Sequence, residues 1–320
     1  MISLEEIERA RERLAGTVVT TPVIELQLDE APAEIWLKLE NLQPIGSFKL
    51  RGAGNAVLAA PSSKLERGLV TTSTGNMAQG VAWMARRLGV PATIVVPDNA
   101  SPGKLAAVER LGGRIVRVPW DEWWAAVEQG EEALAEGIEG FFVHPVRDVP
   151  VMAGNGTIGL ELVEQLDGFD AVLIPWGGGG LTTGIASALA ALAPETKVVV
   201  CEPENGAPVT AALANGGVPV PVEFTPSFVD GSGSSGLLPE VWEHARSLVS
   251  SSAVVSLAAA ADTIRLLLER ARILAEGAAA LPVAAALAGA GGTGRVVCII
   301  SGGNIDPQRL AAILSGTVPD

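Results

Sequence analysis

Apolar residues along this chain occur in two kinds of stretch that alternate for most of its length. Short apolar runs bounded by Gly, Pro or polar residues predict buried strands, and longer stretches with apolar residues at helical spacing predict helices. The predicted strands are residues 18–24, 35–40, 69–72, 92–96, 114–118, 141–144, 171–174, 197–201 and 296–300. The predicted helices are residues 4–15, 52–60, 76–88, 102–111, 121–136, 151–165, 180–192, 207–214, 258–275, 277–288 and 307–314. Such alternation is typical of βαβ units, so we expect an α/β fold with parallel sheets flanked by helices.

Capping residues and glycines mark the ends of several of these elements. Ser3 and Glu6 have the spacing of a capping box, which starts the first helix. Gly89 and Gly112 follow predicted helices, as C-terminal glycines commonly do. Residues 216–236 are rich in Gly, Pro and Ser, so we expect a long loop there that acts as a lid or as a connector.

Composition restricts the classes of partner. The chain has 320 residues, of which 48% are apolar, so it can bury a sizeable core in one or two domains. Its net charge of −14 argues against a nucleic-acid or anionic-membrane surface. No uncharged run approaches the length of a bilayer span and the N-terminus has no hydrophobic signal core, so we expect a cytoplasmic protein. A homodimer is the expected assembly, because dimers are the commonest oligomers.

The few cysteines and histidines restrict the chemistry further. Cys201 and Cys298 lie in or at the end of apolar runs and are expected as small core residues, although the sequence alone leaves a disulfide between them open. His144 and His244 have no cysteine or carboxylate at ligand spacing, so no zinc site is expected.

One lysine lies in an apolar setting, in the segment Pro44-Ile45-Gly46-Ser47-Phe48-Lys49-Leu50-Arg51-Gly52-Ala53. Lys49 falls at or just inside the start of a predicted helix, where the helix dipole and partial burial both disfavour the ammonium form. A lysine of lowered pKa can hold a carbonyl cofactor as a Schiff base. Because an isolated lysine more often lies at the surface, three other segments decide between the two interpretations.

Four consecutive glycines, Gly177 to Gly180, join predicted strand 171–174 to predicted helix 180–192. Successive backbone N–H groups in such a turn can converge on one anion, and the helix dipole adds to the attraction. The turn has neither the ending of a P-loop nor the spacing of the dinucleotide fingerprint. Alone it fits a flexible loop equally well, and beside a Schiff-base lysine it predicts a phosphate site.

Two further segments follow predicted strands. Ser301-Gly302-Gly303-Asn304 follows strand 296–300, and its glycines leave room for a flat ring, although an ordinary turn fits Ser301 equally well. Thr72-Ser73-Thr74-Gly75-Asn76-Met77-Ala78-Gln79-Gly80 joins a strand to a helix, so its N–H groups can receive a second anion.

These four segments resemble, in order and approximate spacing, those of the serine/threonine dehydratase and serine racemase family of fold-type-II pyridoxal-phosphate enzymes. The likeness covers nearly the whole chain. It implies a two-domain α/β fold similar to the tryptophan synthase β subunit. Residues 1–67 and 144–320 would form a large domain that binds pyridoxal 5'-phosphate, with a small domain, residues 68–143, inserted in it. The cofactor is expected in the cleft between them, at the carboxyl ends of the strands.

The resemblance also implies residue roles. Lys49 and Thr74 would be catalytic. Ser73, Thr74, Gly75 and Asn76 would bind the substrate carboxylate. The expected cofactor-binding residues are Phe48, Lys49, Asn76, Gly177, Gly178, Gly179, Gly180, Leu181 and Ser301. A neutral serine hydroxyl on the pyridine nitrogen makes the ring a weaker electron sink than a carboxylate would, which favours elimination over transamination.

The expected activity is that of a dehydratase or ammonia-lyase that converts L-threonine, L-serine or a related β-hydroxy amino acid to a 2-oxo acid and ammonia. A serine racemase or a β-replacement enzyme similar to threonine synthase is the alternative, and a catalytically silent amino-acid-binding relative is the non-enzymatic one. Thr74 stands where racemases usually have serine, which disfavours racemisation. Leu50 stands where threonine synthases usually have aspartate.

Some other positions depart from the family pattern or match it outside these segments. Met77 and the bulky Trp176 suggest an altered substrate pocket. Glu202 matches one acidic residue of a cation site seen in relatives, but Pro208 occupies the second position, so no metal is expected. Glu276 matches a glutamate near the family's active site, and a helix-end carboxylate is its ordinary interpretation.

Overall fold

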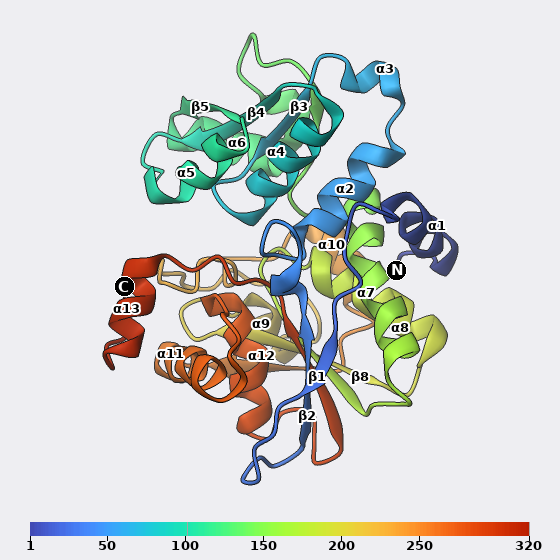
Figure 1. Ribbon diagram of the computed structural model, residues 1–320, viewed down its shortest axis with the longest axis vertical. Coiled ribbons are helices and arrows are strands. Elements are labelled where there is room, and N and C mark those ends of the chain that lie inside the picture. The colour runs from blue at the N-terminus through green and yellow to red at the C-terminus, as the bar shows by residue number, and fades with distance from the viewer. Residues whose placement is uncertain (101, 320) are drawn as a thin grey trace.

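The computed structural model describes residues 1–100 and 102–319, and this part of the chain forms two β-sheets (Figure 1). The larger sheet has strand order β1-β2-β10-β7-β8-β9, and the smaller has order β5-β4-β3-β6. Strand β1 is antiparallel to β2, whereas the other pairs in both sheets are parallel. The strands are β1 (Val23–Glu25), β2 (Glu34–Leu39), β3 (Leu69–Thr72), β4 (Ala92–Pro97), β5 (Arg114–Val118), β6 (Phe141–Phe142), β7 (Ala171–Pro175), β8 (Lys197–Pro203), β9 (Ser251–Val255) and β10 (Arg295–Ile300).

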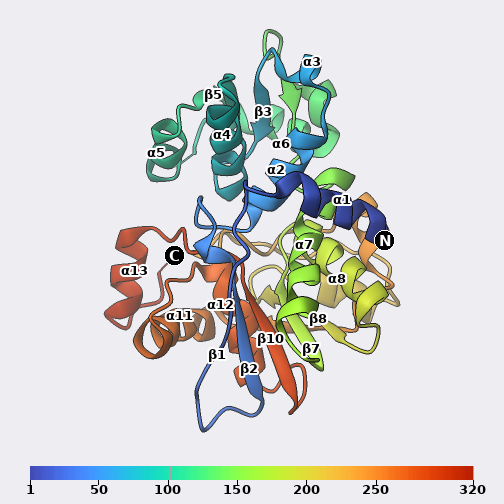
Figure 2. The ribbon, with the colours of Figure 1, turned by 45° about the vertical axis from the view of Figure 1, so that its right-hand side comes forward.

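Helices flank both sheets, which confirms the expected α/β fold (Figures 1 and 2). The helices are α1 (Leu4–Leu14), α2 (Lys49–Ala59), α3 (Ser62–Leu65), α4 (Asn76–Leu88), α5 (Pro102–Arg110), α6 (Trp120–Gln129), α7 (Val149–Gln165), α8 (Gly180–Leu192), α9 (Pro208–Ala214), α10 (Pro239–Ala245), α11 (Leu257–Leu266), α12 (Gly277–Leu287) and α13 (Pro307–Leu314). Short 3-10 turns occur at Glu40–Leu42 (η1) and Gly130–Ala133 (η2), and a π-helical turn occurs at Leu267–Ala271 (η3). No helix among the described residues is both long and apolar enough to cross a membrane.

The alternation of side chains along the strands determines which helices cover each face of the larger sheet. In β7, Ala171 and Leu173 belong to the core beneath α11 and α12, whereas Val172 and Ile174 belong to the core beneath α7 and α8. Successive residues of a strand point to opposite faces, so an unbroken apolar run is buried on both sides. Figure 2 shows α7 and α8 on one side of β7 and β10, with α11 and α13 on the other.

Helix α2 lies between the two sheets (Figure 1). Its residues Leu50 and Ala53 pack in the core of the smaller sheet with Met77 of α4. Its opposite side approaches α7 so closely that a Cβ atom at Gly154 would overlap the Arg51 carbonyl group. The helix that begins at Lys49 is therefore held by both parts of the molecule.

Some predicted boundaries are wrong. The strand predicted at 18–24 forms only over Val23–Glu25, because the Val19 N–H and carbonyl bond the Gln43 side chain instead of a neighbouring strand. The helix predicted at 121–136 ends at Gln129, where Gly130 takes a φ of 82°. The helix predicted at 258–275 ends at Leu266, and a π-helical turn follows it.

Other elements differ from the sequence prediction in smaller ways. Strand β6 ends at Phe142 instead of residue 144. Strand β9 and the short helices α3 and α10 were not predicted, because each is too short for a periodic pattern to be distinguished. Ser3 does cap α1 by accepting the Glu6 N–H, but the Glu6 carboxylate pairs with Arg9 instead of completing the capping box.

Candidate active site

The segments that follow β2 and β10 are hydrogen-bonded to each other at the carboxyl end of the larger sheet. The Phe48 N–H donates to the Ser301 carbonyl at 3.0 Å, and Ser47 forms an isolated β-bridge with Gly302. Because β2 and β10 are adjacent parallel strands, their carboxyl ends lie at the same edge of the sheet. Lys49 and Ser301 are 252 positions apart in the numbering. They therefore lie at the same edge of the larger sheet.

Lys49 is the first residue of α2 and is partly buried. Its Nζ donates to the Pro145 carbonyl at 2.8 Å and lies 5.3 Å from the centre of the Phe48 ring. Burial lowers the pKa of Lys49 to about 8, although the negative charge of Glu276 opposes this effect. The amine therefore loses its proton more readily than that of an ordinary lysine, as a nucleophile or a base requires.

The tetraglycine turn joins β7 to α8. Gly179 takes a φ of 90°, which favours glycine, and the free N–H groups of the first turn of α8 follow it. A Cβ atom at Gly178 would lie 2.6 Å from a methyl of Val146, and one at Gly180 would lie 2.7 Å from the Val146 carbonyl oxygen. The turn therefore leaves no room for side chains on this side.

A single short turn connects the lysine to the glycines. Pro145 accepts the Lys49 hydrogen bond, and the next residue, Val146, is the one packed against Gly178 and Gly180. The amine and the tetraglycine turn therefore contact adjacent residues of one segment. A Schiff-base lysine and a phosphate-binding turn have to lie close together to hold one cofactor, and this arrangement meets that condition.

Residues Ser73 to Asn76 join β3 to α4 at the carboxyl end of the smaller sheet. All four are partly exposed, and the Gly75 N–H donates to Ser73 Oγ at 3.2 Å. Apart from the two neighbours of Gly75 in the chain, no described residue would have an atom within 4 Å of a Cβ atom at Gly75. The start of α4 is thus open beside this loop, with N–H groups that have no partner within the helix.

Asn76 is tied to the larger sheet by a carboxylate and an amide. Its Nδ2 donates to both oxygens of Glu276, at 2.8 and 3.1 Å, and its Oδ1 accepts from Asn304 at 2.7 Å. Burial raises the pKa of Glu276 to about 7, with the charge of Asp230 adding to the effect and the Asn76 hydrogen bond opposing it. Gly302, the residue after Ser301, lies against the same carboxyl group, because a Cβ atom at Gly302 would be 2.5 Å from Glu276 Oε1.

The sequence was also compared with known protein families. Residues 14–302 match the family described as pyridoxal-phosphate dependent enzyme. The chain belongs to this family. Its members depend on pyridoxal phosphate, in agreement with the cofactor that the sequence predicted.

Close relatives and solved structures agree with this assignment. An L-threonine ammonia-lyase of Thermotoga maritima is 38% identical over 320 residues, which cover 98% of this chain and 79% of the relative. The structure of maize serine racemase has a TM-score of 0.88 at 29% identity and covers 98% of this chain and 97% of that one. The structure of the T.th. threonine deaminase has a TM-score of 0.84 at 35% identity and covers 95% of this chain and 99% of that one.

Two expectations about the substrate pocket of this family member are wrong. Met77 has only 1% of its surface exposed and packs in the core of the smaller sheet. Trp176 is equally buried, with its ring 6.0 Å from that of Trp242 and its edge beneath Gly179. Trp176 therefore supports the tetraglycine turn and does not widen or narrow a pocket.

Glu202 accepts hydrogen bonds from the N–H groups of Val209 and Thr210 at the start of α9, which is an ordinary structural role.

Sequence reasoning missed three residues around the site. Pro145 and Val146 have no chemical signature of their own, and only the folded chain brings them against Lys49 and the glycines. Asn155 of α7 donates to the Gly180 carbonyl at 3.3 Å. A polar residue among the small and apolar residues of 151–162 was the available signal for it.

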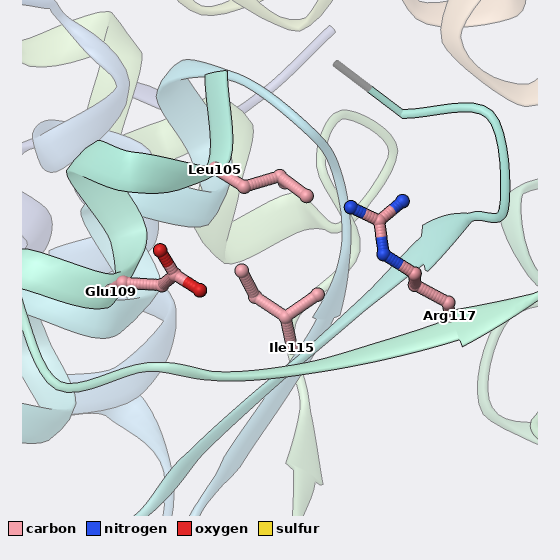
Figure 3. Close-up of a pocket in the computed structure, with 4 residues that line it drawn as sticks. All are labelled: Leu105, Glu109, Ile115 and Arg117. Atoms are coloured by element: carbon pink, nitrogen blue, oxygen red, sulfur yellow. The ribbon is translucent and has the colours of Figure 1, made fainter. Parts of the chain in front are cut away.

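A separate cavity of about 270 Å³ lies between α5 and β5 (Figure 3). Leu105, Glu109, Ile115 and Arg117 line it, and Figure 3 shows the carboxylate and the guanidinium on either side of the two apolar side chains. None of these four residues takes part in the contacts around Lys49. The cavity is therefore separate from the candidate active site.

Proposed function

We propose that this chain is an ammonia-lyase that acts on L-threonine, L-serine or a related β-hydroxy amino acid and releases a 2-oxo acid and ammonia. The observation that carries the proposal is the placement of Lys49, whose amine of lowered pKa contacts the turn that packs on Gly178 and Gly180. The names of the T. maritima ammonia-lyase and the T.th. deaminase support threonine as a substrate.

The residues of the site fit pyridoxal phosphate. Ser301 is nearly buried at the carboxyl end of β10, and its hydroxyl would bind the pyridine nitrogen. Gly177 to Gly180 and the start of α8 would bind the phosphate, and Lys49 would bind the aldehyde beside the Phe48 ring. When bound, the cofactor supplies an electron sink for the bond broken at the substrate Cα.

The chain itself performs the remaining steps. Ser73, Thr74, Gly75 and Asn76 would hold the substrate carboxylate at the open start of α4. Lys49, once its amine is free, would take the Cα proton, because a pKa near 8 lets it accept and return a proton at neutral pH. The β-hydroxyl then leaves as water, with Thr74 as the second proton-carrying group beside the substrate. Hydrolysis of the released enamine gives 2-oxobutanoate from L-threonine and pyruvate from L-serine.

Replacement of Lys49 tests the proposal. In Lys49→Ala we expect the visible absorbance of the protein-bound cofactor to lose its sensitivity to borohydride, and the release of 2-oxo acid from L-threonine and L-serine to fall by about 10³-fold or more. Lys64→Ala is the matched control, because Lys64 is exposed on the short helix α3. Unchanged 2-oxo acid release in Lys49→Ala would contradict the proposal.

Serine racemisation is the second candidate, and the likeness to maize serine racemase favours it. Both activities need a base on one face of the substrate, but racemisation also needs a proton donor on the opposite face. Thr74 has a hydroxyl for that purpose, with an added methyl group that crowds it. Chiral chromatography of L-serine incubated with the enzyme distinguishes the two activities, since a lyase depletes serine without producing the D-enantiomer.

A further inference from the structure

The turn from His144 to Asp148 follows β6 and touches both parts of the molecule. The His144 ring has 1% of its surface exposed. Its Nδ1 lies 3.0 Å from the Val146 nitrogen and 2.9 Å from the Arg147 nitrogen, and both of these N–H groups donate to it. Its Nε2 lies 2.9 Å from the Val127 carbonyl of α6. Because Nδ1 accepts two hydrogen bonds, the ring proton is on Nε2, which donates to Val127.

The environment keeps this ring neutral. Burial lowers the pKa of His144 to about 4, and the positive charges of Arg147 and Lys49 act in the same direction, whereas the bond to Val127 opposes them. An acceptor at Nδ1 and a donor at Nε2 are therefore both present at neutral pH. The ring acts as a fixed link between the turn and α6.

The Val146 N–H that this ring accepts belongs to the same planar peptide unit as the Pro145 carbonyl, and both Pro145 and Val146 contact the proposed cofactor site. The Pro145 carbonyl accepts the hydrogen bond from Lys49 Nζ, and Val146 packs against Gly178 and Gly180. A change in the turn would therefore move the partner of the reactive amine and the support of the glycine turn together.

Arg147 provides a second link to α6. Its Nη1 donates to the Glu128 carbonyl at 2.5 Å and its Nη2 donates to the Gln129 carbonyl at 2.9 Å. These carbonyls belong to the last turn of α6 and have no N–H partner further along that helix. His144 and Arg147 together fasten the turn to a helix of the smaller sheet.

We propose that His144 is a positioning residue for the cofactor site, and that it sets the position of the Lys49 amine and of the tetraglycine turn relative to helix α6. The inference rests on the proposed function, since it assigns a task within the same site. This role would make the cofactor site depend on helix α6, which contributes none of the expected cofactor-binding residues.

Two substitutions separate the parts of this role. Asn in place of His144 can accept the same two backbone N–H groups through Oδ1, as in an Asx turn, but it is too short to reach Val127. Leu fills comparable space and accepts no hydrogen bond. We expect His144→Leu to weaken the binding of pyridoxal phosphate about 10-fold and His144→Asn about 3-fold, because a buried unpaired backbone group is costlier than one lost contact.

Three measurements on the cofactor-loaded enzyme distinguish positioning from stability alone. They are the dissociation constant of pyridoxal phosphate, the pH midpoint of the absorbance change of the bound cofactor, and kcat with KM for the amino acid. We expect His144→Leu to shift the pH midpoint and to lower kcat, with KM nearly unchanged. In His144→Asn we expect the pH midpoint and kcat to return to the wild-type values. A lower melting temperature with wild-type cofactor affinity and pH midpoint in His144→Leu would overturn the proposal.

Controls complete the test. His244→Leu replaces the other histidine, whose ring contacts the amino group of Met1, and should leave all three measurements unchanged. If His144→Leu does not fold, His144→Asn carries the test by itself, because it keeps an acceptor for the two backbone N–H groups and removes only the bond to Val127. We then expect cofactor binding about 3-fold weaker, and unchanged binding would overturn the proposal. If the wild-type enzyme releases no 2-oxo acid, the proposed function fails, whereas cofactor affinity still tests His144.

Discussion

At the scale of single residues, two ionisable groups of the site have pKa values displaced toward neutrality. Burial lowers the pKa of Lys49 to about 8 and raises that of Glu276 to about 7. In both groups burial disfavours the charged form, so burying them lowers the stability of the folded protein at a pH where they would otherwise be charged. Strongly perturbed groups beside each other are a common feature of catalytic sites, where the protonation state has to change during turnover.

The displaced pKa of Glu276 predicts how stability depends on pH in the cofactor-free protein. Its carboxyl keeps its proton in the folded state up to about pH 7, whereas the unfolded carboxyl loses it near its ordinary value of 4.5. The folded state therefore binds more protons between these values, and stability falls as the pH rises through this window. Between pH 5 and pH 8 the free energy of unfolding of the wild type should fall because of this group. We expect the fall to be about 2–3 kcal/mol smaller in Glu276→Gln.

Urea denaturation at the two pH values measures this difference. Glu30→Gln is the control, because Glu30 is exposed and far along the chain from Glu276. An identical pH dependence in wild type and Glu276→Gln would contradict the raised pKa.

At the scale of elements, the start of α8 is fixed from three directions. The glycine turn lies above Trp176, the Gly180 carbonyl accepts from Asn155 of α7, and Val146 packs on the outer side. Further along α8, a Cβ atom at Gly184 would overlap the Met152 carbonyl of α7, so the two helices are in direct backbone contact. The free N–H groups at the start of α8 are thus presented at a fixed place, which reduces the cost of binding an anion.

A methyl group at Gly180 tests the importance of this arrangement. Its Cβ atom would lie 2.7 Å from the Val146 carbonyl oxygen, which is backbone and cannot move unless the turn that contacts Lys49 moves with it. We expect Gly180→Ala to cost about 1–3 kcal/mol of stability and to weaken cofactor binding at least about 10-fold. Gly236→Ala is the matched control, because no described residue other than its two chain neighbours has an atom within 4 Å of its Cβ position. Cofactor titration followed by absorbance provides the measurement, and wild-type affinity in Gly180→Ala would refute the proposed phosphate cradle.

At the scale of the whole molecule, we propose that the two sheets mark two domains, with residues 68–143 inserted between the segments of the larger one. Strands β3 to β6 all lie within that range, and all strands of the larger sheet lie outside it. Helix α2 and the bond between Asn76 and Glu276 cross from one part to the other. Each part thus contributes to the surroundings of Lys49.

A buried cluster of charges joins distant segments behind the lysine helix. Arg51 of α2 is 1% exposed and pairs with Glu40 of η1 at 2.7 Å and with Glu161 of α7 at 2.7 Å. Lys38 of β2 donates to the same Glu161 at 2.5 Å. Removal of one partner from such a cluster leaves a buried charge uncompensated.

Arg51→Met should therefore be strongly destabilising. We expect it to lower the free energy of unfolding by about 3–5 kcal/mol, since Glu40 and Glu161 keep their burial but lose a shared cation. Arg9→Met removes an exposed arginine that pairs with Glu5 on α1 and should change stability by less than about 1 kcal/mol. Chemical denaturation of both variants measures the difference, and equal losses would show that the buried cluster contributes no more than a surface ion pair.

The sequence determined the fold class and the chemistry on local grounds. Unbroken apolar runs such as 171–174 can be buried on both faces only inside a sheet covered by helices, so the architecture followed from pattern alone. A lysine before a helix and four glycines after a strand carry their chemical meaning in a few adjacent residues. The two cysteines were expected in the core, and both are buried and free in the described part of the chain.

The tertiary structure alone decided what depends on contacts between distant segments. Nothing in the sequence around Trp176 or Met77 distinguishes a pocket wall from a core residue, and burial settled both. The roles of Pro145, Val146 and His144 are invisible in the sequence, because they arise from contacts with segments that are distant along the chain. The sequence states which groups are present, and only the folded chain places the Pro145 carbonyl 2.8 Å from the Lys49 amine. The burial that lowers the pKa of Lys49 likewise exists only in the folded chain.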